Sequence, residues 1–132
     1  MHVIATRKGN VGGKTFTGRL IDTTTPFVAL PSIRAFNKVV RVTNLANSKS
    51  ILASVLDAGP TNQNDDNYVF DGFQPLAASG IDLGEFVWGS LGMTGTGLVD
   101  WEFVVNPAAL LTVGITGTAS EDTAALVRKS GH

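Results

Sequence analysis

Short runs of β-branched and alternating residues recur along the 132-residue chain and predict a mainly β protein. In residues 98–105, Val99, Trp101 and Phe103 fall on one face, and Asp100 and Glu102 fall on the other. This alternation is typical of a strand with one buried face. The predicted strands are residues 3–6, 27–30, 38–44, 50–56 and 98–105. A hairpin turn is expected at Asn47-Ser48, with Asn47 in the left-handed conformation.

One short helix is predicted at about residues 83–91. Asp82 and Glu85 have the spacing of a capping box, which makes Asp82 the expected N-cap. Gly92 stands where a C-terminal cap is expected. The apolar stripe of this helix consists of Leu83, Val87 and Leu91.

Two further segments lack strand periodicity. Residues 61–79 are rich in Asn, Asp, Gln and Gly, which predicts a long inserted loop, and such loops are often functional. Residues 115–132 read as a C-terminal tail in which Ser120 caps a short helix. The acidic start and basic end of that helix suit its dipole. We therefore expect one domain at residues 1–114, followed by the tail.

The composition excludes several kinds of chemistry. The chain has no cysteine, and its two histidines, His2 and His132, lie near the chain ends. Disulfides, thiolate catalysis, sulfur-bound zinc and a histidine-based triad are therefore not expected. Any catalysis would use carboxylates, hydroxyls, lysine or backbone amides, and no cofactor is expected.

The charges are divided unevenly along the chain. Residues 1–49 carry eight basic groups and the single acid Asp22, whereas residues 50–127 carry ten acids and no basic group. One interpretation is that the halves interlock and their charges pair across strands. The other is a bipolar surface that favours a homo-oligomer or a larger head-to-tail assembly. Nucleic acid is not an expected partner, because the basic residues are scattered and not interleaved with aromatics.

No apolar run is long enough to span a bilayer, so membrane insertion is not expected. The N-terminal residues lack the basic start and apolar core of an export signal, so none is expected in the chain.

Several short motifs occur in a fixed order within roughly residues 3–106. They are Thr-Gly-Arg-Leu-Ile-Asp at 17–22, Val-Arg-Val-Thr-Asn-Leu-Ala-Asn-Ser-Lys-Ser at 40–50, Asp-Ala-Gly-Pro at 57–60, Ile-Asp-Leu at 81–83, Leu-Gly at 91–92, Gly-Thr-Gly at 95–97 and Val-Asp-Trp-Glu-Phe at 99–103. Together they resemble the double-psi β-barrel of the rare lipoprotein A family and, more distantly, of expansins. The resemblance implies a six-stranded double-psi β-barrel with one short helix and an insertion at residues 61–79.

The resemblance also implies an activity. Enzymes of that family are lytic transglycosylases, which cleave peptidoglycan between N-acetylmuramic acid and N-acetylglucosamine and leave a 1,6-anhydro end. Asp57 falls on the catalytic acid and Asp22 on a supporting acid. The chain departs from the family at Leu30, where the family has histidine, and at Arg19, where it has glutamate. Expansin-like members bind glycans without cutting them, so the resemblance leaves enzymatic activity open.

The residues around the two acids allow two interpretations of each. Asp57 ends an apolar strand, where burial would raise the pKa of its carboxyl and suit proton donation to a glycosidic oxygen. Alternatively, Asp57 caps the Gly-Pro turn through backbone amides. Asp22 precedes three hydroxyl-bearing residues suited to sugar contacts, or else it pairs with Arg19 or Arg41. The hydroxyl cluster consists of Thr23, Thr24 and Thr25.

Four more residues are predicted to contact a glycan. Trp88 lies off the apolar stripe and is a candidate platform for sugar rings, and Tyr68 in the insertion is a candidate for stacking on a glycan or for a protein contact. Asn44 and Asp82 complete the set, whereas the alternation assigns Trp101 to the core. The polar insertion lacks the central glycine and closing glutamate of a calcium loop, so no metal is expected. Its candidate ligands would have been Asn62, Asn64, Asp65, Asp66 and Asp71.

Two functions follow from these patterns. The first is a domain that binds peptidoglycan glycan strands and, as a lytic transglycosylase, uses Asp57 as acid and base. The alternative is a non-catalytic structural or assembly component, of a phage particle or a secreted protein, that uses the barrel for protein or wall contacts. Either would act at the cell wall, in the periplasm or within a phage particle.

Overall fold

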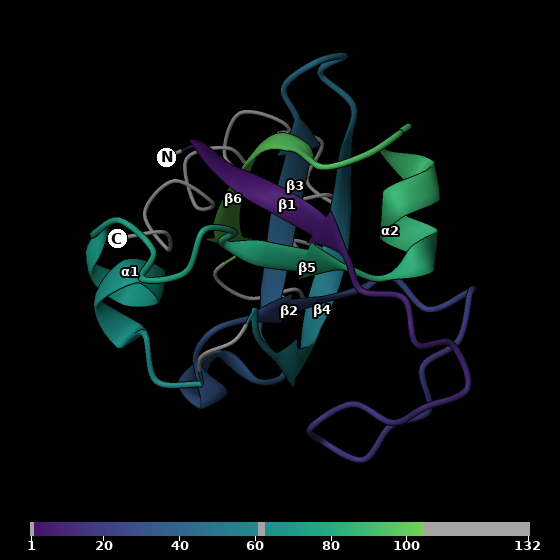
Figure 1. Ribbon diagram of the computed structural model, residues 1–132, viewed down its shortest axis with the longest axis horizontal. Coiled ribbons are helices and arrows are strands. Elements are labelled where there is room, and N and C mark those ends of the chain that lie inside the picture. Colours follow the sequence, from purple (N-terminus) through teal and green to yellow (C-terminus); the bar gives the residue numbers. More distant parts are fainter. Residues whose placement is uncertain (1, 61–62, 105–132) are drawn as a thin grey trace, which may run out of the picture.

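The computed structural model describes residues 2–60 and 63–104 (Figure 1). This part of the chain forms six strands, two short α-helices and one 3-10 turn. In chain order they are β1 (His2–Arg7), β2 (Phe27–Leu30), the 3-10 turn (Ile33–Ala35), β3 (Val39–Asn44), β4 (Ser50–Ala58), α1 (Asp66–Asp71), β5 (Ile81–Leu83), α2 (Glu85–Ser90) and β6 (Gly97–Val104).

The strands close into a barrel in the order β1-β5-β2-β4-β3-β6. The β1–β5 and β2–β4 pairs are parallel and the other pairs are antiparallel. Closure pairs both edges of each described strand, which removes the exposed backbone groups of an open sheet. The mainly β, six-stranded mixed barrel implied by the resemblance is therefore confirmed.

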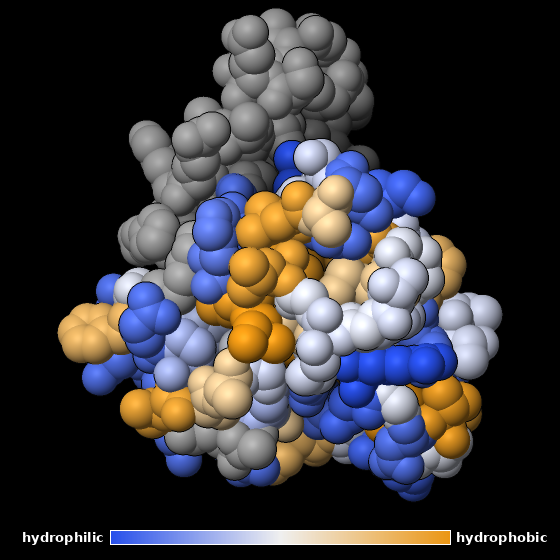
Figure 2. Space-filling view, turned by 45° about the horizontal axis from the view of Figure 1, so that its top comes forward, coloured by the Kyte–Doolittle hydropathy of each residue, from blue (hydrophilic) through white to orange (hydrophobic). Residues whose placement is uncertain are grey.

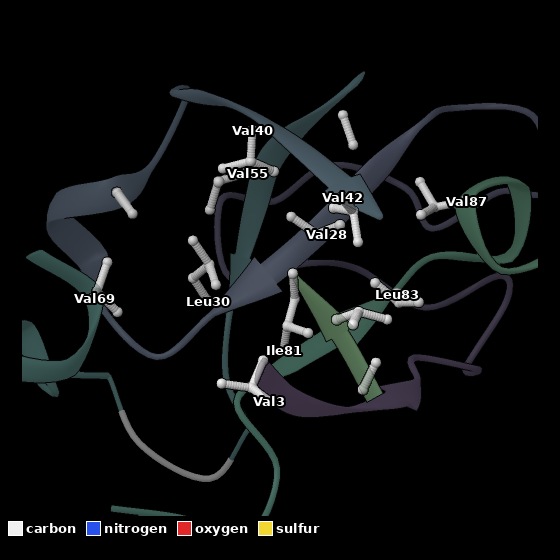
Figure 3. Packing of buried hydrophobic residues seen from close by; sticks show 14 of the residues in the cluster. Val3, Val28, Leu30, Val40, Val42, Val55, Val69, Ile81, Leu83 and Val87 are labelled. Carbon is white, nitrogen blue, oxygen red and sulfur yellow. The ribbon is translucent and has the colours of Figure 1, made fainter. Parts of the chain in front are cut away.

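The barrel interior is filled by aliphatic side chains from all six strands (Figure 3). Along β3, buried and partly buried positions alternate, so that Val40 and Val42 point inward. Every residue of β2 is buried, including Leu30, which stands where the rare lipoprotein A family has histidine. Trp101 is partly buried against this core, in line with the alternation predicted for its strand.

The five predicted strands are confirmed, but the structure adds a sixth that the pattern missed. Asp82 lies in β5 and does not cap a helix, because β5 pairs with β1 on one side and β2 on the other. The helix is also shorter than predicted, since α2 begins at Glu85 after Gly84 as its N-cap. In the β3–β4 hairpin, the residue with positive φ is Ser48 (63°) rather than Asn47.

The polar insertion is partly helical. It contains α1, which ends at Gly72 in the left-handed conformation and buries Tyr68 and Val69. Figure 1 shows α1 on the opposite side of the barrel from α2. Asn62 and the predicted tail at residues 115–132 lie outside the described residues.

Ion pairs join the basic and acidic halves of the chain, as the interlocking interpretation predicts. Within residues 2–60 and 63–104, the pairs with Lys or Arg are Arg7–Glu85, Lys8–Asp57 and Arg34–Asp66. Each connects a basic residue before position 50 with an acid after it, so the uneven charge distribution is at least partly compensated within the fold. Among the described residues, no helix is long and apolar enough to cross a membrane.

Candidate functional site: a carboxylate row across the barrel

Strand register brings polar residues from distant parts of the sequence into one row. Thr6 of β1 pairs with Asp82 of β5, Asp82 pairs with Ala29 of β2, and Ala29 pairs with Asp57 of β4. Residues that are paired across adjacent strands have side chains on the same face. Lys8, just after β1, adds an ammonium group beside Asp57. We call Thr6, Lys8, Asp57 and Asp82 the carboxylate row.

Asp57 is buried, and both of its carboxylate oxygens have partners within the protein. Its Oδ1 accepts hydrogen bonds from the backbone N–H groups of Phe16 (2.7 Å) and Ala58 (2.9 Å). Its Oδ2 lies 2.8 Å from the Lys8 Nζ. Asp57 therefore fixes the loop that carries Phe16 to the end of β4, which is a more extensive version of the predicted cap. In this arrangement a ligand would have to displace Lys8 or the loop before it could reach this carboxyl.

Asp82 differs from Asp57 in being half-buried with a single close donor. The Thr6 hydroxyl donates to its Oδ1 in a short hydrogen bond. Burial raises the pKa of the Asp82 carboxyl, an effect that the negative charge of Asp57 reinforces and that the Thr6 hydrogen bond and the Lys8 charge oppose. The surroundings of Asp82 therefore favour the protonated form of its carboxyl.

Asp22 lies in a separate cluster. Its Oδ1 accepts from the amides of Thr24 (3.1 Å) and Thr25 (2.8 Å), and its Oδ2 accepts from the Thr25 hydroxyl (2.9 Å). These hydrogen bonds, with the nearby charge of Arg19, lower the pKa of the Asp22 carboxyl. Asp22 thus stabilises the turn before β2, and its partners differ from those of Asp57. Thr23 and Thr24 remain exposed there.

Trp88 is half-buried against the core, and one face of its ring is occupied. The Arg7 guanidinium carbon lies 6.0 Å from the ring centroid. Two hydrogen bonds to Glu85, of 2.7 and 2.8 Å, hold the guanidinium in place. A sugar ring would have to displace Arg7 to stack on that face, so Trp88 is less available than its sequence position suggests.

Two of the residues predicted to contact a glycan are buried and form hydrogen bonds within the fold. Tyr68 is buried; its hydroxyl donates to the Gly80 carbonyl (2.9 Å) and accepts from the Trp101 Nε1 (2.7 Å). Asn44 is also buried; its Nδ2 donates to the Leu91 carbonyl (2.8 Å) and its Oδ1 accepts from the Ala46 amide (3.0 Å). Both side chains are buried in this fold, so neither Tyr68 nor Asn44 presents its polar atoms at the surface, and their contact with a glycan stays a prediction.

Sequence reasoning missed Thr6 and Lys8. Neither residue belongs to a motif that carries the family resemblance. Thr6 meets Asp82, and Lys8 meets Asp57, only in the closed barrel, where β1 pairs with β5. The uneven charge distribution was the one available signal, since it predicts pairing between a basic residue near the start and an acid beyond residue 50.

An open pocket of about 360 Å³ lies apart from this row, beside α1. Asp65 at its wall is buried and accepts a hydrogen bond from the Leu76 amide (2.9 Å). The other lining residues are Asn64, Asp66, Asn67, Phe73, Gln74 and Leu76. In the described part of the chain, no group of three His, Asp or Glu side chains is arranged to hold a metal ion.

Two solved structures share this fold. The Streptomyces papain inhibitor (SPI) is 19% identical with a TM-score of 0.53, and the match covers 78% of this chain and 92% of the inhibitor. Cerato-platanin 3 from M. perniciosa is 12% identical with a TM-score of 0.52, and the match covers 83% of this chain and 98% of that protein. At these identities the similarity shows the fold alone, and it supports the double-psi β-barrel implied by the resemblance.

No curated protein matches the sequence. A family model does match, over residues 1–74, which include β1 to β4 and three members of the carboxylate row. The chain belongs to the family described as Domain of unknown function (DUF8814).

Proposed function

We propose that this domain binds peptidoglycan glycan strands at the carboxylate row, with Asp82 as the central contact. The observation that supports it best is the environment of Asp82, a half-buried carboxyl with a raised pKa beside the Thr6 hydroxyl. A protonated carboxyl both donates and accepts hydrogen bonds, and so does a hydroxyl, which matches the hydroxyl, ether and acetamido groups of a glycan. Lys8, whose side chain is 22% exposed, adds a donor at the same place.

The finer form of the proposal is lytic cleavage with Asp82 in the role that the motifs assign to Asp57. The Asp82 carboxyl would give its proton to the glycosidic oxygen as the bond to C1 of N-acetylmuramic acid breaks. The Asp82 carboxylate would then take the proton from the C6 hydroxyl of the same sugar as O6 bonds to C1. The products are a 1,6-anhydro sugar and a free 4-hydroxyl on N-acetylglucosamine, with no water consumed. The charge of Asp57, which is paired with Lys8, lies close enough to raise the pKa of Asp82.

Binding and cleavage are tested together with purified sacculi. The wild type should sediment with sacculi, and Asp82→Leu, which removes both the donor and the acceptor, should weaken binding about tenfold, as expected for loss of a hydrogen bond to a charged or polarised group. Asp71→Leu is the matched control, because Asp71 is an exposed carboxyl at the end of α1. Failure of the wild type to bind, or equal binding by all three proteins, would refute the proposed site. If binding holds but no 1,6-anhydro-muropeptides form, the domain is a glycan binder without turnover.

A second candidate function, protein binding, is favoured by the loop between β1 and β2. This loop projects from the barrel in Figure 1, and its two arms are joined by backbone hydrogen bonds from Gly12 to Ile21 (2.8 Å) and from Ile21 to Gly13 (2.9 Å). The loop exposes more than half of each of three apolar side chains, which are Val11, Phe16 and Leu20. A pre-ordered loop with exposed apolar groups loses little entropy on docking into a partner's cleft.

Such a loop would serve an assembly component or an inhibitor. Since the inhibitor with this fold acts on papain by its printed name, papain is the first partner to test. Inhibition of papain that Phe16→Ser abolishes would support this second function. Light scattering at low and high salt would test self-assembly, and a monomer at every salt concentration that leaves papain fully active would count against it.

A further inference from the structure

Three exposed aliphatic side chains lie beside the carboxylate row. Ile4 and Thr6 are two residues apart on β1, so both face outward and their Cα atoms are roughly 6.6 Å apart. Ile4 pairs with Leu98 of β6, and the Leu45 amide donates to the Leu98 carbonyl (3.2 Å). The exposed fractions of these side chains are 42% for Ile4, 52% for Leu98 and 37% for Leu45. We call these three residues the aliphatic strip.

The strip and the row form one continuous surface. The order across it is Leu45, Leu98, Ile4, Thr6 and Asp82, and each neighbouring pair is joined by strand register, by a backbone hydrogen bond or by their alternation on β1. Figure 2, in which the top of Figure 1 is brought forward, shows an apolar area near the middle of this face and smaller apolar groups towards its edges. A ligand that covers this surface therefore needs a polar part and an aliphatic part next to each other.

A glycan alone does not supply the aliphatic part. Sugar rings stack on aromatic faces, and the strip consists of aliphatic side chains only. We infer that the strip binds the peptide stem that muramic acid carries on its lactyl group, whose methyl and alanine side chains are small and aliphatic. This inference rests on the proposed function, and it makes stem-bearing peptidoglycan, rather than stem-free glycan, the preferred ligand. Because Ile4 lies close to Thr6, a peptide stem that extends from a sugar bound at Asp82 would reach the aliphatic strip.

The test compares two soluble probes, a disaccharide-tetrapeptide muropeptide and the same disaccharide after an amidase has removed the peptide. We expect the wild type to bind the stem-bearing probe about tenfold more tightly, as for burial of two or three methyl groups. Ile4→Thr and Leu98→Thr should remove this difference and leave the affinity for the stem-free probe unchanged. Both variants keep a strand-forming residue at an exposed position, and matching thermal unfolding would show that they fold.

Leu52→Thr is the matched control, because Leu52 is an equally exposed leucine (42%) on β4 and faces Arg41 rather than the strip. The Leu52→Thr variant should bind the stem-bearing probe more tightly than the stem-free probe by the same factor as the wild type. If the wild type binds both probes equally, or if Ile4→Thr weakens both alike, the inference is overturned while the proposed function stands. If the wild type binds neither, both are overturned. Self-association that the strip variants abolish, without any preference between probes, would assign the strip to contact with a second copy and would also overturn the inference.

Discussion

The Lys8 ammonium lies 2.8 Å from the Asp57 carboxylate, and this pair connects the residue just after β1 with the end of β4. The side chains are 22% and 6% exposed, so the charges are largely withdrawn from water. Asp57 also holds the Phe16 amide, which fixes the projecting loop to the barrel. The residue that sequence motifs assign to catalysis is thus a central anchor of the loop in the folded protein.

Removing one partner of the Lys8–Asp57 pair should destabilise the folded protein. Lys8→Met is expected to lower the free energy of unfolding by about 3 kcal/mol, because it leaves a buried carboxylate without its counter-charge. Urea unfolding of the two proteins measures the change. The matched control is Arg34→Met, which breaks the exposed Arg34–Asp66 pair and should cost about 1 kcal/mol or less. Equal losses in the two variants would show that Lys8–Asp57 behaves as an ordinary surface pair.

For Asp82 we expect the opposite effect on stability: replacing this residue should stabilise the protein at neutral pH, whereas Lys8→Met destabilises it. Because its pKa is raised, the folded protein binds this proton more tightly than the unfolded chain does. The penalty for a charged Asp82 therefore appears as the pH rises from the ordinary carboxyl value of 3.8 towards the raised one. Asp82→Asn removes the penalty and leaves an oxygen that can accept the Thr6 hydrogen bond.

We therefore expect Asp82→Asn to be more stable than the wild type at neutral pH, and the advantage should vanish in acid. Thermal unfolding of both proteins across this pH range would measure it. A variant that is less stable at neutral pH, or a difference that does not change with pH, would contradict the raised pKa.

The strands could be predicted from sequence because their signal is local. In β2 and β3, β-branched residues recur with strand periodicity, and the structure begins and ends both strands within one residue of the prediction. The sequence Asp82–Glu85 also has a local signal, but for a helix cap. The pairing of β5 with β1 and β2 overrides that signal, and it depends on residues more than 50 positions away.

The candidate site was harder to predict for the same reason. A pattern around Asp57 marks the end of a strand, but nothing local shows that Lys8 will neutralise it or that the Phe16 amide will cover it. Tyr68 lies in an insertion rich in polar residues, and nothing in that local composition indicates that its side chain is buried. The six residues of α1 turn this side chain inward, where it meets the Gly80 carbonyl.

Tyr68 gives a spectroscopic test of that burial. It is the chain's single tyrosine, so tyrosinate absorbance reports on this residue alone. Burial raises the pKa of its hydroxyl, an effect opposed by the hydrogen bond from Trp101 and reinforced by the charge of Asp65. We expect no ionisation in the folded protein at pH values where free tyrosine, with a pKa near 10, is already ionised. Denaturant should restore the ordinary titration, and an ordinary titration without denaturant would show that Tyr68 is accessible.

The Asp22 turn predicts a carboxyl that resists protonation. Its pKa is lowered chiefly by the Thr25 amide, then by the Thr25 hydroxyl and the Thr24 amide. Thr25→Val removes the hydroxyl and keeps both amides and the β-branched shape, so the pKa of Asp22 should rise part of the way towards its ordinary value of 3.8. Carboxyl ¹³C NMR across an acid titration measures this shift. Thr23→Val is the control, since Thr23 is an exposed neighbour and the hydrogen bonds to Asp22 come from Thr24 and Thr25.

The lowered pKa of Asp22 also determines how the contribution of this turn to stability depends on pH. The folded state favours ionised Asp22, so this contribution is present above the ordinary pKa and is lost as the pH falls through the lowered one. Thr25→Val should therefore lose stability relative to the wild type at neutral pH and approach it in strong acid, whereas Thr23→Val should follow the wild type throughout. If both variants titrate alike at Asp22, the hydroxyl of Thr25 does not hold the carboxylate, and the turn before β2 is maintained by the amides alone.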